Sequence, residues 1–286
     1  MPTLRWSQRM EDLFNKHVTL PVLDDVDSDW NRKFGYTINV IRDEIIQKGL
    51  ADFREGYSSK GNRTLTADEK VLLYCFVNMK QHYFEAISTF RAYEKRLKPL
   101  FELGQKTIVF DLGCGPGTAG LALAECFVGV KPKLQYIGVD LAPAMRQMAR
   151  SMLNDAIENS LFATGSNTAF RSTWNAVNDL ATKITVSCSV LINASYLFAS
   201  DSLDVDHVSD FVRALKKQAR VKTLLLTYAN STDSRAGKKF TEFKQKLENE
   251  YKTTGHKQAT LTFQKKRSDI ATVDRTYVRQ LLRFKE

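Results

Sequence analysis

Residues 111 to 120 carry the strongest chemical signal of the chain, Asp-Leu-Gly-Cys-Gly-Pro-Gly-Thr-Ala-Gly. The apolar run Thr107 to Phe110 precedes this glycine-rich stretch, and the apolar run Leu121 to Ala124 follows it. This order predicts a strand, a tight loop and the first turn of a helix. Glycines let backbone N–H groups approach a ligand closely, so such a loop is typical of a nucleotide-type cleft.

Two kinds of nucleotide ligand fit this loop. Gly115, Gly117 and Gly120 have the G-x-G-x-x-G spacing of dinucleotide-binding proteins. However, the carboxylate of Asp111 at the strand end would repel a pyrophosphate. It would suit S-adenosylmethionine (SAM), which carries a sulfonium and an ammonium group and no phosphate. The sequence therefore favours SAM, and the alternative is a loop that only packs a helix against a strand.

At this point the chain resembles the class I SAM-dependent methyltransferases. The segment from Asp111 to Gly117 matches the first motif of that family at every defining position. The resemblance covers about residues 104 to 286 and implies an α/β fold with a seven-stranded, mostly parallel, doubly wound sheet. It also implies SAM as the cofactor, bound by Asp111, Gly113, Cys114, Gly115 and Gly117.

A second acidic residue supports the resemblance. The apolar run that begins at Leu134 ends in Asp140, 29 residues after Asp111, an interval that one strand–helix unit fills. We therefore expect Asp140 at the tip of the neighbouring strand, where its carboxylate can accept hydrogen bonds from both ribose hydroxyls. Leu141 and Met145 are similar to the family's residues that flank the adenine ring. Taken alone, an acid after a strand is more often a helix cap.

Later apolar runs supply the remaining strands of the expected sheet. Continuous apolar runs fit strands that are buried on both faces, and the candidates are residues 169–174, 189–193, 223–228, 259–263 and 277–284. We expect the last two to form an antiparallel edge. The family contacts the adenine just after its third strand, which implies Trp174 and Asn175 here. The usual acid is absent at that point, and Asn175 or Asp179 would have to replace it.

Catalysis of methyl transfer requires mainly that the acceptor be held in line with the methyl–sulfur bond. Asn193-Ala-Ser-Tyr196 ends the predicted fourth strand and resembles the N-P-P-Y motif of methyltransferases that act on amino groups of bases, without the two prolines. The resemblance implies that Asn193 holds an exocyclic amine while Tyr196 stacks on a flipped base. A contact of Asn193 with the methionine end of the cofactor, or a chance N-x-x-Y match, is the alternative.

Composition limits the class of protein. With 286 residues, 43% of them hydrophobic, the chain can bury one large core plus an appendage. No apolar stretch approaches the ~20 residues that span a bilayer, and the first residues do not resemble a signal peptide. The four cysteines and four histidines are scattered, so we expect no metal site, reduced thiols and a cytoplasmic location.

Residues 1–103 predict an N-terminal helical region ahead of a methyltransferase domain at residues 104–286. Helical spacing occurs at residues 4–18 and 29–57. Within the same region, Thr66-Ala-Asp-Glu69 forms a capping box.

After this capping box, apolar residues recur at helical steps up to Leu97 and predict one long helix or two broken ones. One interpretation is that this segment only packs on the sheet. The other is a lid, whose polar residues, such as His82, Tyr83 and Arg91, close over the methionine end of the cofactor.

Positive charge is concentrated in the last quarter of the chain. Residues 211–286 hold 19 Lys and Arg against 7 Asp and Glu, a net charge of +12, whereas residues 1–210 hold 23 against 25, a net charge of −2. Basic residues beside the carboxyl ends of the strands could follow a phosphate backbone, so we expect a nucleic acid partner, RNA in preference to DNA. The alternative is a solvated basic surface. The candidates are Lys216, Lys217, Arg220, Lys238, Lys239, Lys265, Lys266 and Arg267.

Three functions remain open on the sequence alone. The first is a SAM-dependent methyltransferase that acts on RNA, such as rRNA or tRNA, or on another nucleic acid. The second is the same chemistry on a small molecule or a protein side chain, and the third is a non-catalytic protein that binds SAM or RNA. The helical segment before Asp111 and the basic C-terminal half also give a fainter resemblance to methyltransferase-like proteins that assist small ribosomal subunits. Those proteins often carry a cysteine cluster that this chain lacks.

Overall fold

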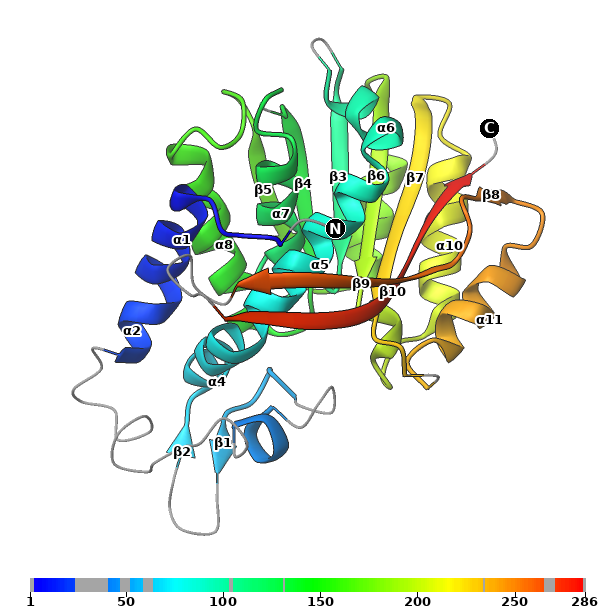
Figure 1. Ribbon diagram of the computed structural model, residues 1–286. Coiled ribbons are helices and arrows are strands. Elements are labelled where there is room, and N and C mark those ends of the chain that lie inside the picture. Colours follow the sequence, from blue (N-terminus) through cyan, green and yellow to red (C-terminus); the bar gives the residue numbers. More distant parts are fainter. Residues whose placement is uncertain are drawn as a thin grey trace.

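One central sheet organises the fold of the computed structural model, which describes residues 3–23, 41–46, 52–58, 64–102, 105–130, 132–233, 235–264 and 271–284 (Figure 1). Within these ranges the sheet has eight strands in the order β5-β4-β3-β6-β7-β10-β8, with β9 paired to β10. Strands β3 to β7 are parallel, and β10 runs antiparallel to β7, β8 and β9. Their bounds are β3 Thr107–Leu112, β4 Leu134–Val139, β5 Asn167–Arg171, β6 Cys188–Ser195, β7 Val221–Asn230, β8 Tyr251–Thr253, β9 Lys257–Gln264 and β10 Thr272–Phe284. A separate small hairpin pairs β1 (Tyr57–Ser58) with β2 (Thr64–Leu65).

Helices cover both faces of this sheet. The α-helices in the described ranges are α1 Gln8–Phe14, α2 Leu20–Leu23, α4 Ala67–Tyr74, α5 Lys80–Ala92, α6 Glu94–Leu97, α7 Thr118–Cys126, α8 Pro143–Glu158, α9 Trp174–Thr182, α10 Val205–Lys216 and α11 Lys238–Lys246. Short π-helical turns span Asn15–Thr19, Ile41–Ile45 and Cys75–Met79, and short 3-10 turns span Lys98–Phe101 and Leu197–Ala199.

The central strand β3 contributes to two hydrophobic clusters. Val109 packs with buried residues of α5, α7 and α8 on one face, whereas Ile108 and Phe110 pack with α9, α10 and α11 on the other. Side chains alternate along a strand, so a strand with every residue buried must be covered on both sides. The predicted doubly wound, mostly parallel α/β architecture is therefore confirmed.

The N-terminal helices share their core with the sheet. Phe84 and Phe90 of α5 belong to the same buried cluster as Val109 of β3 and Leu123 of α7, and α5 contacts α7, β7, β9 and β10. Helix α5 therefore lies across one face of the sheet, as Figure 1 shows. The division of the chain after residue 103 stays a prediction.

The local signals for the start of α4 are confirmed. The Thr66 hydroxyl accepts a hydrogen bond from the Glu69 backbone N–H, and the Glu69 carboxylate accepts one from the Thr66 backbone N–H at 2.7 Å. The helix then continues, through one π-helical turn, to Ala92 and breaks at Tyr93. The helix predicted over residues 29–57 lies largely outside the described residues, and Tyr57 is in a strand.

A long hairpin joins the end of the chain to its beginning. Strand β10 pairs with β7 through its second half and with β9 through its first half, which runs across the same face as α5 (Figure 1). Leu4 extends this hairpin, because its N–H donates to the Thr262 carbonyl at 2.8 Å and its carbonyl accepts from the Gln264 N–H at 3.1 Å.

The strands differ from the sequence prediction at two places. The third strand was expected to reach Trp174, but β5 ends at Arg171 and Trp174 begins α9. The reason is local, since the Thr173 hydroxyl accepts from the Ala176 N–H and caps the helix. Strand β8 was not expected, and its three residues are largely exposed and carry no apolar run.

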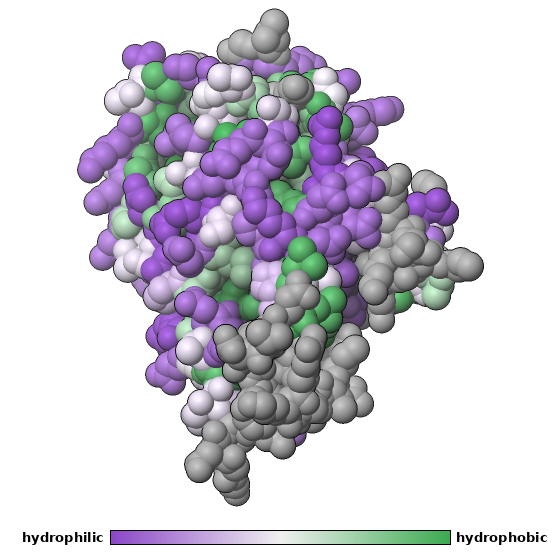
Figure 2. Space-filling view, turned by 90° about the vertical axis from the view of Figure 1, so that its left-hand side faces the viewer, coloured by the Kyte–Doolittle hydropathy of each residue, from purple (hydrophilic) through white to green (hydrophobic). Residues whose placement is uncertain are grey.

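The side of the molecule seen in Figure 2, which includes α1 and α2, is mostly hydrophilic. In α2, the large apolar side chains of Leu20 and Leu23 have 50% and 46% of their surface exposed. Among the described residues, no helix combines the length and the apolar character needed to cross a membrane.

Gly120 allows the first turn of α7 to pack against β4 and α8. A Cβ atom added there would lie 2.9 Å from the Tyr136 ring and 2.9 Å from Leu153. Alanine in place of glycine stabilises a helix by about 1 kcal/mol, but overpacking destabilises a fold by typically 1–3 kcal/mol. We therefore expect Gly120→Ala to lower the free energy of unfolding by up to about 2 kcal/mol. Gly129→Ala is the control, since a Cβ there meets nothing within 4 Å. Chemical denaturation of both variants measures the difference, and equal stabilities would contradict the close packing.

Candidate functional site

The loop after β3 has a backbone that only glycine adopts without strain. Gly113, Gly115 and Gly117 have φ angles of 69°, 50° and 80°, in the left-handed region. The N–H groups of Gly113 and Cys114 both donate to the Val139 carbonyl, at 2.8 and 2.9 Å. The loop is thereby held on the end of β4, as a strand–loop–helix unit requires.

The outer side of this loop is open at Gly115. A Cβ atom placed on Gly115 would meet only the Met145 sulfur, at 4.0 Å. By contrast, a Cβ on Gly117 would contact Ala149 and Leu153 of α8 at 3.1–3.3 Å. Gly117 therefore serves the packing of the loop on α8, whereas Gly115 leaves room for a ligand.

Asp140 lies at the tip of β4, next to the loop, as the sequence predicted. One carboxylate oxygen accepts from the Gly115 N–H at 3.0 Å and the other from the Ala142 N–H at 2.9 Å. Burial raises the pKa of Asp140, and these two hydrogen bonds oppose that effect. Each oxygen has a second lone pair, so the carboxylate can still accept the hydroxyls of a ribose.

Asp111 lies beneath the loop, with only 1% of its surface exposed. Its two oxygens accept hydrogen bonds from the Tyr136 hydroxyl and from the Asn193 amide, the latter at 2.7 Å. Burial raises the pKa of Asp111 to about 6, although both hydrogen bonds act to lower it. The carboxylate is thus part of the support of the loop, and its contact with positive groups of SAM stays a prediction.

Asn193 is buried at the end of β6 and bonds within the protein. Its amide nitrogen donates to Asp111, and its oxygen accepts from the Ser195 and Thr227 hydroxyls at 3.0 and 3.2 Å. The sequence predicted that this amide holds an acceptor amine or borders the cofactor. The geometry gives it a supporting role beneath the strand ends, and the catalytic role stays a prediction.

Tyr196 follows β6 and faces the N-terminal helix. Its backbone has a φ of 62°, unusual for a residue with a side chain, and its N–H donates to the Ala229 carbonyl at 2.8 Å. Its hydroxyl donates to Glu85 of α5 at 2.6 Å, and its ring packs on the His82 ring with centroids 4.2 Å apart. The predicted stacking of Tyr196 on a base stays untested.

Glu85 is the centre of this group of side chains. Its side chain is 1% exposed, and its carboxylate accepts from His82 Nδ1 at 3.0 Å, from Tyr196 and from Arg275 Nε at 2.8 Å. Burial by itself would raise the pKa of Glu85, but the hydrogen bonds and charges of these partners outweigh it and hold that pKa below its usual value. We call Glu85, His82, Tyr196 and Arg275 the Glu85 cluster.

The Glu85 cluster adjoins the glycine loop. Leu197, directly after Tyr196, would be 3.2 Å from a Cβ atom on Gly113. The Tyr74 ring lies near the ring of His82, with centroids 6.3 Å apart, and burial raises the pKa of the Tyr74 hydroxyl. The α4–α5 segment thus covers the carboxyl ends of β3, β4 and β6.

Of the lid residues suggested by the sequence, only His82 borders this site. Tyr83 is buried and stacks on Trp6, with centroids 4.4 Å apart, and Arg91 is exposed on the far part of α5. Helix α5 therefore packs on the core through Tyr83 and borders the candidate site through His82.

The remaining predicted cofactor residues differ in exposure. Leu141 directly follows Asp140 and has 55% of its surface exposed, whereas Met145 and Cys114 are buried. Burial raises the pKa of the Cys114 thiol well above its usual value, and the contact of this residue with the cofactor stays a prediction.

Trp174 and Asn175 lie at the start of α9. The Trp174 ring stacks near His207 of α10, with centroids 6.1 Å apart, and Asn175 is exposed. Their predicted contact with the adenine stays a prediction.

Basic residues of the last quarter lie at both ends of the sheet. At the amino end of β7, Lys217, Arg220, Lys222, Lys252 and Arg283 are exposed, and Arg283 pairs with Lys252 across β10 and β8. We call these five residues the basic edge. It lies opposite the glycine loop, which is at the carboxyl end of the parallel strands. Lys265, Lys266 and Arg267 lie outside the described residues.

Other cations of this quarter are used inside the protein. Lys239 donates to the carbonyls of Ser200, Asp201 and Leu203 at 2.6–2.9 Å, and Lys216 pairs with Glu250 at 2.6 Å. These two lysines therefore hold loops and helices together. Lys238, at the start of α11, is exposed.

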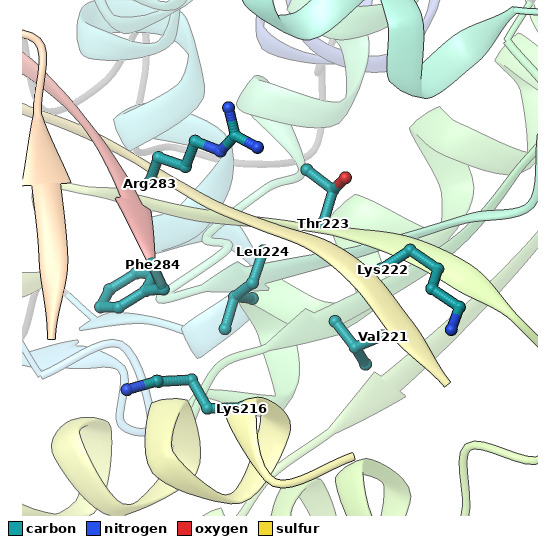
Figure 3. Close-up of a pocket in the computed structure, with 7 residues that line it drawn as sticks. All are labelled: Lys216, Val221, Lys222, Thr223, Leu224, Arg283 and Phe284. Atoms are coloured by element: carbon teal, nitrogen blue, oxygen red, sulfur yellow. The ribbon is translucent and has the colours of Figure 1, made fainter. Parts of the chain in front are cut away.

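A small hollow at the basic edge is not the ligand site. Its volume is about 30 Å³, which is room for about one water molecule, and its lining includes Lys216, Lys222 and Arg283 (Figure 3). In Figure 3 these three cationic groups point in different directions. They do not converge on one anion.

Two residues of the site, Glu85 and Arg275, were not predicted from the sequence. Glu85 carried one available signal, since it is an acid within the apolar run from Tyr83 to Phe90 and a buried acid needs partners. Arg275 carried none. Among the described residues, no three His, Cys, Asp or Glu side chains gather as metal ligands would, and the four cysteines are free thiols.

Comparison with known proteins gives similarity in fold only. No family model matches the sequence, and no curated protein does. Among solved structures, the chain is similar to an arsenic(III) S-adenosylmethionine methyltransferase from Chlamydomonas reinhardtii (15% identity, TM-score 0.42, 71% of this chain and 73% of that one). It is also similar to a candidate rRNA methylase from Clostridium thermocellum (11%, 0.43, 69% and 97%) and to TrmN from Thermus thermophilus (13%, 0.41, 74% and 53%).

The raised pKa of Asp111 gives a prediction about stability. A carboxyl whose pKa rises on folding to about 6 stabilises the fold most at low pH, and this contribution is lost as the pH rises through that value. Between about pH 4 and pH 7 the loss should be on the order of 3 kcal/mol. The substitution Asp111→Asn removes the titrating carboxyl. The free energy of unfolding of this variant should therefore fall less between these two pH values than that of the wild type. Denaturant titrations at both pH values test this, and parallel pH profiles for the two proteins would refute it.

Proposed function

We propose that this chain is a SAM-dependent methyltransferase. The observation that carries the proposal is the pairing of the open glycine loop with Asp140 on the neighbouring strand, joined by the hydrogen bond from the Gly115 N–H at 3.0 Å. A nucleoside bound there would meet backbone N–H groups, a carboxylate for its ribose and the exposed side chain of Leu141 for its base.

The residues around the loop fit SAM better than a dinucleotide. The carboxylates of Asp140 and Asp111 border the loop, and negative charge opposes a pyrophosphate. The cation beside them, Arg146, donates to the carbonyls of Asp140 and Leu141 at 2.6 and 2.9 Å. The charges of the two carboxylates suit the ammonium and sulfonium groups of SAM. When bound, SAM would supply an activated methyl group on a sulfur that is already a good leaving group.

The protein's part in the reaction is then to bind and orient. The loop from Gly113 to Gly117 and Asp140 would hold the nucleoside, and the α4–α5 segment would cover the reacting end and exclude water. Asn193 and Tyr196 remain candidates for positioning the methyl acceptor. Asn193 would act through its hydrogen bond to Asp111, and Tyr196 through its aromatic ring.

For the acceptor we propose RNA. The support is the charge distribution, a net charge of +12 in residues 211–286 against −2 elsewhere, together with the five exposed cations of the basic edge. Contacts of this kind bind phosphates irrespective of sequence. Because the edge is at the opposite end of the sheet from the loop, it would anchor a long RNA while another part of the RNA reaches the site.

The cofactor assignment predicts a role for Asp140. We expect the wild type to bind SAM and its demethylated product, but not NAD. Losing charge-assisted hydrogen bonds to the ribose should cost about 1.5–3 kcal/mol, so Asp140→Ala should bind SAM roughly 10- to 150-fold more weakly. Isothermal titration calorimetry measures both, with the exposed Glu158→Ala on α8 as control. Unchanged SAM affinity in Asp140→Ala, or wild-type binding of NAD, would make the assignment wrong.

The RNA assignment predicts that position matters as well as net charge. The triple variant Lys217→Glu, Lys222→Glu, Lys252→Glu removes three contacts of the basic edge and should weaken RNA binding and flatten its salt dependence. The control triple variant Arg9→Glu, Lys133→Glu, Lys183→Glu changes the net charge equally at exposed sites elsewhere. Filter binding to total cellular RNA over a salt series compares them. Equal losses of RNA affinity in both variants would mean that the basic edge is a solvated surface without a specific role in RNA binding.

A further inference from the structure

The Glu85 cluster contains one basic ring nitrogen that is available to a ligand. His82 Nδ1 lies 3.0 Å from the Glu85 carboxylate, and its other ring nitrogen, Nε2, has no hydrogen-bond partner among the described residues. The His82 side chain is 19% exposed, whereas that of Glu85 is 1% exposed. The imidazole therefore stands between a buried carboxylate and the space above the strand ends.

The geometry fixes which nitrogen of His82 is the base. The Arg275 guanidinium at 2.8 Å and the hydroxyl of Tyr196, which donates at 2.6 Å, stabilise Glu85 as a carboxylate, and a carboxylate only accepts hydrogen bonds. The proton of a neutral His82 must then be on Nδ1, which leaves the lone pair of Nε2 free. The packing of His82 on Tyr196, at 4.2 Å between centroids, holds the ring in this orientation.

We propose that His82, oriented by Glu85, is the general base that takes the proton of the methyl acceptor; this rests on the proposed methyltransferase function. The lone pair of the acceptor atom forms the bond to the methyl carbon while the carbon–sulfur bond breaks and leaves its electron pair on sulfur. The proton of the acceptor passes to His82 Nε2, and the imidazolium that forms is stabilised by the Glu85 carboxylate.

The other titratable groups at the site are less suited to this role. Glu85 has both carboxylate oxygens in hydrogen bonds, and Arg275 carries a permanent positive charge. Burial raises the pKa of the Tyr196 hydroxyl well above its usual value, and that hydroxyl donates to Glu85. Asp111 is covered by the loop and bonded to Tyr136 and Asn193.

A general base narrows the class of acceptor. It is needed where the acceptor atom carries a hydrogen that must leave, as in a hydroxyl or a neutral amino group. It is not needed for a ring nitrogen without hydrogen or for a thioether. A general base at His82 therefore implies an acceptor atom that carries a hydrogen, such as a ribose hydroxyl or the exocyclic amine of a base.

The tautomer of His82 tests the geometry without any turnover. In nitrogen-15 NMR spectra of labelled wild-type protein, the neutral His82 ring should carry its proton on Nδ1, the form that Glu85 selects. His17 is a matched control, since its Nε2 is 2.8 Å from Asp155 and its side chain is 17% exposed. Its neutral ring should carry the proton on Nε2. A neutral His82 with its proton on Nε2 would overturn the proposal, because the free lone pair would then face Glu85.

Chemical rescue tests the reaction. With radiolabelled SAM and total cellular RNA, His82→Ala should lose about 100-fold or more of the labelling rate, and added imidazole should restore part of it. SAM affinity by calorimetry should stay unchanged, and His17→Ala should label like the wild type.

Full labelling by His82→Ala, or a loss that imidazole does not restore while the variant is folded and binds SAM, would reject the base and leave the proposed function intact. A wild type that binds no SAM, or that binds it and labels nothing, would reject the proposed function itself.

Discussion

The ion pair between the buried Glu85 and the partly exposed Arg275 is the constraint on which the candidate site depends. A carboxylate with 1% exposure has lost its hydration, and its charge is tolerated only because Arg275, Tyr196 and His82 replace the water. These partners come from β10, from the end of β6 and from α5 itself. Satisfying one buried charge therefore fixes α5 relative to β6 and β10, and it orients the imidazole of His82.

A second polar network supports the loop from below. Asp111 of β3, Tyr136 of β4, Asn193 of β6 and Thr227 of β7 supply one side chain each, and hydrogen bonds link them in sequence. Four adjacent parallel strands are thus joined at their carboxyl ends by polar contacts within an apolar core. In a low-dielectric interior such contacts hold geometry well when every member is satisfied. The glycine loop and Asp140 rest on this base.

The sequence predicted the parts of the site that depend on local conformation. The glycine loop and the position of Asp140 followed from residue types and from the length of one strand–helix unit, and the α4 cap followed from four consecutive residues. The sequence also indicated Asn193 and Tyr196 at a strand end, but not their partners. Those partners are 82 and 111 residues away, respectively, and spacing within a segment says nothing about contacts between distant segments. Arg275 could not be found, because nothing in its neighbourhood distinguishes it from other surface cations.

The joining of the two ends of the chain has a consequence for biosynthesis. Leu4 pairs with β9, and Glu85 bonds a residue 190 positions later in the sequence. A ribosome releases the chain from its N-terminus, so the first helices emerge long before the hairpin that covers them exists. Contacts of such long separation form late. The parallel strands and the packing of α5 on α7 can form earlier, while Glu85 still lacks Arg275. We therefore expect the glycine loop to form in the nascent protein before the Glu85 cluster is complete.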